Sequence, residues 1–213
     1  MQNLLVRTAS GVVLLGVVLA AAFTGYCGFS ALLMLITIVG VWEFYQLAMA
    51  KGVAPQRCMG LIASLLLFGA SYCALESVVG GRGVGMLGFA LALLLVTVIA
   101  LIFFVEVFRN KENPLLNIAT TIMGVAYVAL PMSLMLFIPV LITGEWKPEA
   151  FLFYLFIVWG NDVFAYLTGI AIGKHKMSPR ISPKKSWEGF AGGIVGAIAM
   201  GAVGSFVVGG SLG

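Results

Sequence analysis

Apolar runs of about 20 residues, the length that a helix needs to cross the hydrocarbon core of a bilayer, recur along the whole chain. Charged residues make up 9% of the 213 residues, whereas soluble domains average about 25%. The sequence therefore predicts an all-α fold, a polytopic transmembrane helical bundle, and excludes a soluble globular domain. About seven spans are predicted, at residues 8–24, 28–50, 58–78, 84–108, 116–142, 149–173 and 189–210.

The basic residues alternate between the two sides of this predicted topology. Of the 12 Lys and Arg residues, all except Arg82 and Lys147 lie before the first span or in the second, fourth and sixth connections. Cytoplasmic loops carry an excess of Lys and Arg, so the N-terminus and the loop 174–188 are predicted to be cytoplasmic. We expect a multi-pass protein of a bacterial-type inner membrane, and we attribute the net charge of +4 to topology rather than to a nucleic-acid partner.

The chain is predicted to form a single integral membrane domain, residues 1–213. It comprises N-terminal helices (1–148), a region of motifs (149–193) and a Gly-rich last span (189–210). The opening residues, Met1 to Ala22, also fit a signal peptide, because Arg7 precedes an apolar run that ends in alanines. An exposed Gly-rich face on the last span would favour a homodimer. Pro131 and Pro139 interrupt the fifth run and predict either a kink or a functional break.

The sixth span carries polar residues near its centre, Asn161 and Asp162, and Asp162 is the only aspartate of the chain. An acid inside a membrane span marks a candidate functional site. Tyr166, Gly169 and Gly173 share a stripe about 60° wide with Asp162, and the glycines should leave room for a ligand. The alternative is a buried Asp162 that bonds Tyr or Asn for helix packing.

Glu43 and Glu106 lie near predicted span ends, where hydration would remove most of the cost of burying their charges.

The loop that follows the sixth span holds five cations between Lys174 and Lys185 and no acid before Glu188. Ser-Pro pairs stiffen its backbone, so Lys184 and Lys185 would be presented in a fixed geometry suited to phosphate oxygens. The loop equally fits a role in binding anionic lipid headgroups or in setting topology. His175, the only histidine, is interpreted as a bystander among the cations.

These residues form a continuous pattern. It reads Asn161-Asp162-x-x-Ala165-Tyr166-x-x-Gly169-x-x-x-Gly173-Lys174, followed by Ile181-Ser182-Pro183-Lys184-Lys185-Ser186-Trp187-Glu188-Gly189-x-x-Gly192-Gly193. The pattern resembles the phosphatidate cytidylyltransferase family, also called CDP-diacylglycerol synthase. The resemblance implies that CTP and phosphatidate give CDP-diacylglycerol and pyrophosphate, with Mg²⁺ as cofactor, in phospholipid biosynthesis.

The resemblance also implies roles for single residues. Lys184 and Lys185 would hold phosphates, and Glu188 would orient these lysines or complete the acidic side. Asp162 would organise the metal or the nucleotide pocket. The implied catalytic residues are Asp162, Lys184, Lys185 and Glu188. The implied binding residues are Asn161, Tyr166, Gly169, Gly173, Lys174, Ser182, Pro183 and Ser186, and the implied metal ligand is Asp162.

The chain departs from the family at its C-terminal end. Members of the family carry a signature there with a Lys-Asp pair, a Pro-Gly-His-Gly-Gly turn and an Asp-Arg-x-Asp end. This chain has one Asp and one His in total, and no acid follows Glu188. We therefore expect a C-terminally truncated member whose metal site, as the family builds it, is incomplete and whose independent activity is in doubt.

Two other classes of function fit the residues. A transporter or channel subunit would use Asp162 as an intramembrane ion site. A non-catalytic membrane protein would use the basic loop to bind anionic lipids.

Overall fold

The computed structural model describes residues 2–81, 83–141, 143–179 and 182–212. The chain divides into two compact units, Met1–Trp146 (unit 1) and Lys147–Gly213 (unit 2). The division falls within two residues of the boundary predicted between the N-terminal helices and the region of motifs. That both units form one membrane domain stays a prediction.

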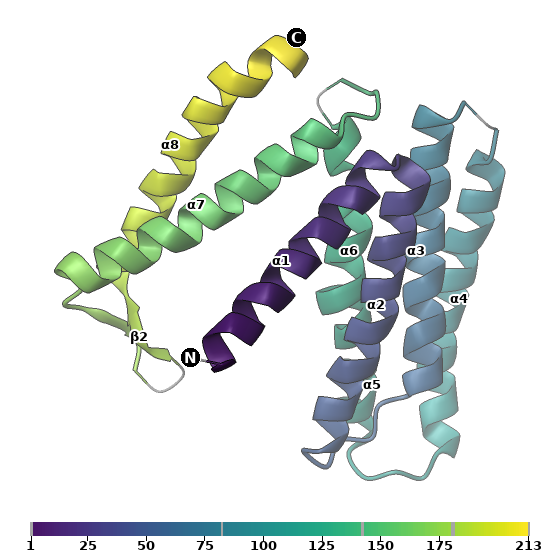
Figure 1. The fold of residues 1–213 in the computed structure, drawn as a ribbon. Coiled ribbons are helices and arrows are strands. Elements are labelled where there is room, and N and C mark those ends of the chain that lie inside the picture. The colour runs from purple at the N-terminus through teal and green to yellow at the C-terminus, as the bar shows by residue number, and fades with distance from the viewer. Residues whose placement is uncertain (1, 82, 142, 180–181, 213) are drawn as a thin grey trace. The chain divides into compact units, whose positions relative to one another are not determined.

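Unit 1 is a bundle of helices joined by short connections (Figure 1). Gly25 makes the turn after the first helix with φ +95°, a conformation that favours glycine because it has no Cβ. Asn113 precedes a helix with Pro114 at its start, where the missing N–H costs nothing. The helices are α1 (Gln2–Phe23), α2 (Tyr26–Met49), α3 (Arg57–Val79), α4 (Gly85–Phe108), α5 (Pro114–Gly124) and α6 (Leu130–Met135).

The predicted fifth span is an interrupted helix. A π-helical segment, Val125–Ala129, joins α5 to α6, and a short 3-10 helix, Ile138–Val140, follows. Pro131 has no N–H, and its ring would collide with the carbonyl oxygen of the residue four positions earlier in a regular α-helix. The wider π-turn just before Pro131 relieves this collision, so the expected interruption is confirmed in its geometry.

The core of unit 1 is built around Tyr45. Its side chain is fully buried beside Val41 of α2, Ala63 of α3, and Val125 and Ala129, the first and last residues of the π-helical segment. Val41 and Ala129 are 88 positions apart along the chain, so the core joins segments that are distant in the sequence.

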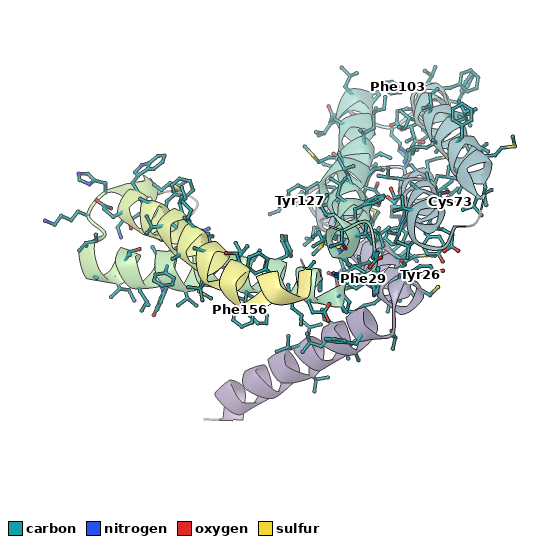
Figure 2. All side chains as sticks on the ribbon, turned by 90° about the horizontal axis from the view of Figure 1, so that it is seen from above. Tyr26, Phe29, Cys73, Phe103, Tyr127 and Phe156 are labelled. Atoms are coloured by element: carbon teal, nitrogen blue, oxygen red, sulfur yellow. The ribbon has the colours of Figure 1, made fainter. Side chains whose placement is uncertain are left out.

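Six helices of the described residues are long and apolar enough to span a membrane, and Val13–Phe23 is a shorter apolar helix. Large apolar side chains cover their outer surfaces. Phe103, Tyr127 and Phe156 are exposed, whereas Phe29 and Cys73 are buried (Figure 2). A surface of this kind suits lipid rather than water. The predicted all-α polytopic membrane fold is confirmed.

Unit 2 consists of two long helices joined by a β-hairpin (Figure 1). The helices are α7 (Pro148–Ile172) and α8 (Trp187–Leu212), and the strands are β1 (Lys176–Ser178) and β2 (Ser182–Ser186). The Gly-rich face of α8 packs against α7: an added Cβ at Gly193 would lie 3.0 Å from Ala165 Cβ, and one at Gly196 would collide with Phe164. Contact with α7 covers this face at Gly193 and Gly196, so it is not the exposed surface that would favour a homodimer, and a homodimer stays a prediction.

Glu106 is buried, although an acid near the end of a span was expected to be hydrated. Glu43 is exposed, as a hydrated acid should be, but Glu106 is only 3% exposed and lies within a polar cluster. Its carboxylate accepts hydrogen bonds from Gln56 Nε2 at 2.7 Å, Asn117 Nδ2 at 2.8 Å and Arg109 Nη1 at 2.6 Å. Protein donors, not water, therefore compensate its charge.

Candidate functional site

The basic segment after α7 folds into an antiparallel hairpin. Lys176 pairs with Ser186, and Ser178 pairs with Ser182, with an irregularity between the two pairs. Lys184 and Lys185 lie on β2 and are exposed, as is Pro183. The sequence predicts stiffened turns at the Ser-Pro pairs. The structure instead places the second pair, Ser182-Pro183, at the start of a strand, and the cross-strand pairing fixes the backbone that carries both lysines.

Ser186 connects the hairpin to both helices. It is buried, and its Oγ accepts a hydrogen bond of 3.2 Å from the backbone N–H of Gly189 in the first turn of α8. A Cβ added at Gly169 would lie 3.5 Å from this oxygen, and one added at Gly173 would lie 2.6 Å from it. Ser186 and Gly189 therefore fill the space over the two glycines, and the expectation of open room for a ligand there is wrong.

Asn161 also faces α8. A Cβ added at Gly193 would lie 2.7 Å from the Asn161 Oδ1 and 3.0 Å from the Asn161 carbonyl oxygen. The motif residues Asn161, Gly169, Gly173, Ser186, Gly189 and Gly193 thus share the contact between α7 and α8. Substitution of these glycines would separate the helices that hold the hairpin.

His175 and Glu188 join the two ends of the hairpin. The Nδ1 of His175 lies 2.6 Å from Glu188 Oε1, and the His175 backbone N–H donates to both carboxylate oxygens at 3.2 Å. The Trp187 N–H donates to the His175 carbonyl oxygen at 3.0 Å. His175 thus has a structural contact that the sequence did not predict, and its interpretation as a bystander rather than a base in the chemistry stays a prediction. Sequence alone gave no sign of this pair, because 13 residues separate the partners.

Glu188 has a different contact from the one expected. Within the described part of the chain, its hydrogen bonds go to His175, and none joins it to Lys184 or Lys185. Glu188 therefore holds the base of the hairpin. Neither lysine ammonium group has a carboxylate partner among the described residues, so their charge is available to an anionic ligand.

A wide, open hollow of about 790 Å³ lies at the base of the hairpin. Three consecutive basic or imidazole side chains, from Lys174 to Lys176, line one part of it, and Trp187, Glu188 and Ala191 line the rest. All three side chains of the first group are exposed. The hollow is large enough for a phosphate-bearing ligand, and cations line it next to a hairpin that carries two more.

Asp162 and Tyr166 lie apart from the hairpin. Both are exposed in unit 2, and Asp162 makes no hydrogen bond with any residue that the structure describes, so the alternative of a bonded packing aspartate receives no support. Gly173 follows Asp162 by eleven positions, which is about 16 Å along the helix. The structure therefore gathers the Ser186, Glu188 and glycine positions and does not bring Asp162 to the lysines.

The donor set does not fit a complete magnesium site. No group of three or more His, Cys, Asp or Glu side chains comes together among the described residues. A magnesium ion prefers carboxylate oxygens and water. The Asp162 carboxylate has no hydrogen-bond partner in the part of the chain that the structure describes, whereas the Glu188 carboxylate is bonded to His175.

Residues 5–212 match the model of a family described as "Cytidylyltransferase family". A phosphatidate cytidylyltransferase of Haemophilus influenzae is 30% identical over 209 residues, which cover 91% of this chain and 70% of that protein. The phosphatidate cytidylyltransferase of Brucella abortus is 28% identical over 207 residues, which cover 94% of this chain and 67% of that protein.

Another relative has a higher sequence identity over a shorter segment. A phosphatidate cytidylyltransferase of Pseudomonas aeruginosa is 58% identical over 38 residues, which cover 18% of this chain and 14% of that protein. No solved structure matches the chain. The family match spans both units and nearly every described helix, and the resemblance first suggested by the motif is confirmed: the chain belongs to the cytidylyltransferase family.

Proposed function

We propose that the chain is a CTP:phosphatidate cytidylyltransferase of phospholipid biosynthesis. Membership of an enzyme family that transfers nucleotidyl groups supports a transferase over a channel subunit or a non-catalytic lipid-binding protein. The names of the relatives support phosphatidate as the lipid substrate. The observation that carries the proposal in this chain is the hairpin, which presents Lys184 and Lys185 beside a cation-lined hollow.

The reaction consists of one exchange at phosphorus. An oxygen of the phosphatidate phosphate attacks the α-phosphorus of CTP, and the bond from that phosphorus to the oxygen that bridges to the β-phosphorus breaks. CDP-diacylglycerol forms, and pyrophosphate leaves with the bridging oxygen. Most of the catalysis of such a transfer is positioning and neutralisation of charge.

The residues of the hairpin suit this task. Lys184 and Lys185 hold the phosphates, and Lys174 adds a third cation at the base of the hairpin. The Ser182 hydroxyl is a donor to phosphate oxygens, and Pro183 restricts the backbone before the lysines. Ser186 acts through position, because its hydroxyl already accepts from Gly189 and lies against Gly169 and Gly173. Glu188 and His175 keep the base of the hairpin closed.

The α7 residues belong to a second part of the site. Asn161 lies at the contact with α8, and the exposed side chains of Asp162 and Tyr166 are available to substrate. The family resemblance implies Mg²⁺, for which Asp162 is this chain's candidate ligand. The described residues do not complete such a site, and no step of the transfer is assigned to the ion.

The location of the substrates sets the orientation. Phosphatidate lies in the bilayer and CTP in the cytosol, so the hairpin belongs on the cytoplasmic side of an inner membrane, the side with most of the basic residues. The N-terminus lies on the same side. This assignment predicts that a reagent that cannot cross the membrane labels Lys184 only in inverted vesicles.

The test of the proposal is conversion of labelled CTP to CDP-diacylglycerol by the purified chain in micelles with phosphatidate and Mg²⁺. Lys184→Ala should lower kcat/KM about 100-fold, the scale found for a lost charge-stabilising donor. Lys51→Ala removes an exposed cation of unit 1 and is the matched control, with kcat/KM expected within about twofold of wild type. A chain that neither converts nor binds CTP would contradict the proposal.

A further inference from the structure

Unit 1 contains a second pocket, of about 420 Å³, that the transfer reaction does not use. The first turn of α3, the end of α2 and the end of α4 surround it. Its lining includes Met49, Gln56, Arg57, Met59, Val105 and Arg109. We propose that this pocket binds the phosphate of an anionic phospholipid headgroup through Arg57 and Arg109. The pocket lies wholly within unit 1, and the proposal is independent of the function assigned to the hairpin.

Arg109 is fixed in place by the interior of the bundle. Its Nη1 donates to Glu106 Oε2 at 2.6 Å and to the carbonyl oxygen of Ala54 at 2.9 Å. Its remaining N–H groups, on Nε and Nη2, donate to no residue that the structure describes. Because one nitrogen is anchored, the rest of the guanidinium is held in position and free to bind an acceptor from outside the protein.

The Glu106 carboxylate does not cancel the charge of the pocket as a whole. It is buried, and Gln56, Asn117 and Arg109 satisfy it. Asn117 also accepts from the Ala54 N–H at 2.9 Å and donates to the Glu112 carbonyl oxygen at 2.9 Å. These bonds tie the connection between α2 and α3 to that between α4 and α5. Glu106 therefore offsets Arg109 alone, and the Arg57 charge has no acidic partner in the described part of the chain.

An aromatic ring, and not an acidic residue, contacts the Arg57 guanidinium in the described structure. Its guanidinium carbon lies 5.1 Å from the centre of the Trp42 ring, and the side chain is half-buried. Arginine stacked on an aromatic face keeps its N–H groups in the plane free for a phosphate. Arg57 also begins α3, and no side chain caps that helix end, so the positive end of a 23-residue helix faces the same pocket.

Gln56 forms part of the wall of the pocket and is held by the interior of the bundle. It lines the pocket and is 6% exposed, and its Nε2 donates to the Ile102 carbonyl oxygen and to Glu106. Its Oε1 is buried without a hydrogen-bond partner in the described structure. Because this oxygen has almost no accessible surface, Gln56 contributes to the wall of the pocket and makes no contact with a ligand through Oε1.

The surroundings favour a lipid over a soluble phosphate. Met49, Met59 and Val105 form apolar parts of the lining, and exposed Trp42 and Phe108 lie close to it in sequence on α2 and α4. Arginines beside such a surface match a phosphate that carries acyl chains. Lys51 and Lys111 are exposed on the same two connections and add to the attraction of an anionic headgroup without lining the pocket.

The test is lipid binding to the purified full chain in detergent, followed by native mass spectrometry. Phosphatidylglycerol is compared with phosphatidylcholine, which shares the phosphodiester but carries no net charge, and with inorganic phosphate. We expect phosphatidylglycerol to bind about tenfold more tightly than phosphatidylcholine. Arg57→Gln should lose about that factor, the scale of one charge-assisted hydrogen bond.

Lys51→Gln is the matched control, because it removes the same charge from the same connection outside the pocket. It should change the affinity by less than about twofold. Arg57→Lys should restore part of the binding, and thermal unfolding of every variant checks that the bundle is intact. A structural role alone would change the unfolding temperature without changing the preference between the two lipids.

Three results would overturn the proposal. Equal losses in Arg57→Gln and Lys51→Gln would mean general attraction to an anionic surface. Equal binding of the two lipids would remove charge recognition. Displacement of phosphatidylglycerol by millimolar inorganic phosphate would assign the arginines to a soluble anion and not to a lipid.

Discussion

The phenolic Oη of Tyr45 donates a hydrogen bond of 2.7 Å to the carbonyl oxygen of Thr121, across 76 residues of sequence. The bond joins α2 to α5 directly before the π-helical segment. The ring fits between two glycines: a Cβ added at Gly60 would lie 2.5 Å from Tyr45 Cζ, and one added at Gly124 would lie 2.5 Å from Tyr45 Cε1. One side chain thus sets the separation of three helices in unit 1.

Tyr45→Phe should lower the free energy of unfolding by about 1 kcal/mol, because the Thr121 carbonyl oxygen loses a donor while the ring keeps its packing. Gly124→Ala should cost more, since an added methyl group meets the Tyr45 ring. Thermal unfolding in detergent measures both. Tyr127→Phe, at a ring that is 71% exposed, is the control and should leave stability unchanged.

Glu106→Ala should destabilise unit 1 by about 3 to 5 kcal/mol, because it leaves the Arg109 charge and two amide donors without their buried partner. Glu112→Ala removes an exposed carboxylate from the adjacent connection and keeps the backbone carbonyl that Asn117 uses. Unfolding midpoints of the two variants should therefore differ clearly. Equal midpoints would show that water, and not Gln56 and Asn117, compensates the Glu106 charge.

Gly193→Ala should weaken the contact of α8 with α7, because the new methyl group would lie 2.7 Å from Asn161 Oδ1. We expect a lower unfolding temperature together with a loss of cytidylyl transfer, since the same helices hold the hairpin. Gly201→Ala lies on the same helix with no atom within 4 Å of the new Cβ. It should be neutral or slightly stabilising, because alanine has the higher helix propensity. Similar losses in both variants would contradict a specific role of the contact at Gly193, because helix propensity favours alanine at both positions.

Glu188→Ala and His175→Ala separate the two kinds of bond at the base of the hairpin. His175→Ala removes the imidazole contact but keeps the backbone N–H that donates to Glu188. Its KM for CTP should rise by no more than about threefold. Glu188→Ala loses all of these bonds and should raise this KM about tenfold or more. If His175→Ala had the larger effect, the imidazole itself would act on the substrate.

The pattern of residues determined the membrane-spanning helices. Every backbone polar group inside a bilayer needs an internal partner, so an apolar run of sufficient length becomes a helix whatever its neighbours are. The interruption of the helix at Pro131 could be predicted in the same way, because a proline lacks its N–H in any context. The motif from Asn161 to Gly193 could also be recognised from the sequence, since the types and spacing of its residues are specific to the family.

The tertiary structure decided which residues meet. The cost of burying Glu106 depends on Gln56, which lies 50 residues away, and no local pattern shows that these side chains come together. Likewise, Gly169 and Gly173 could have floored a ligand site, but Ser186 returns on β2 to fill that space. No specific partner of His175 could be predicted from the sequence, but the register of the hairpin brings Glu188 to it. The pattern of apolar residues shows that a helix is surrounded by lipid. The polar contacts of that helix depend on how segments distant in the sequence pack against it.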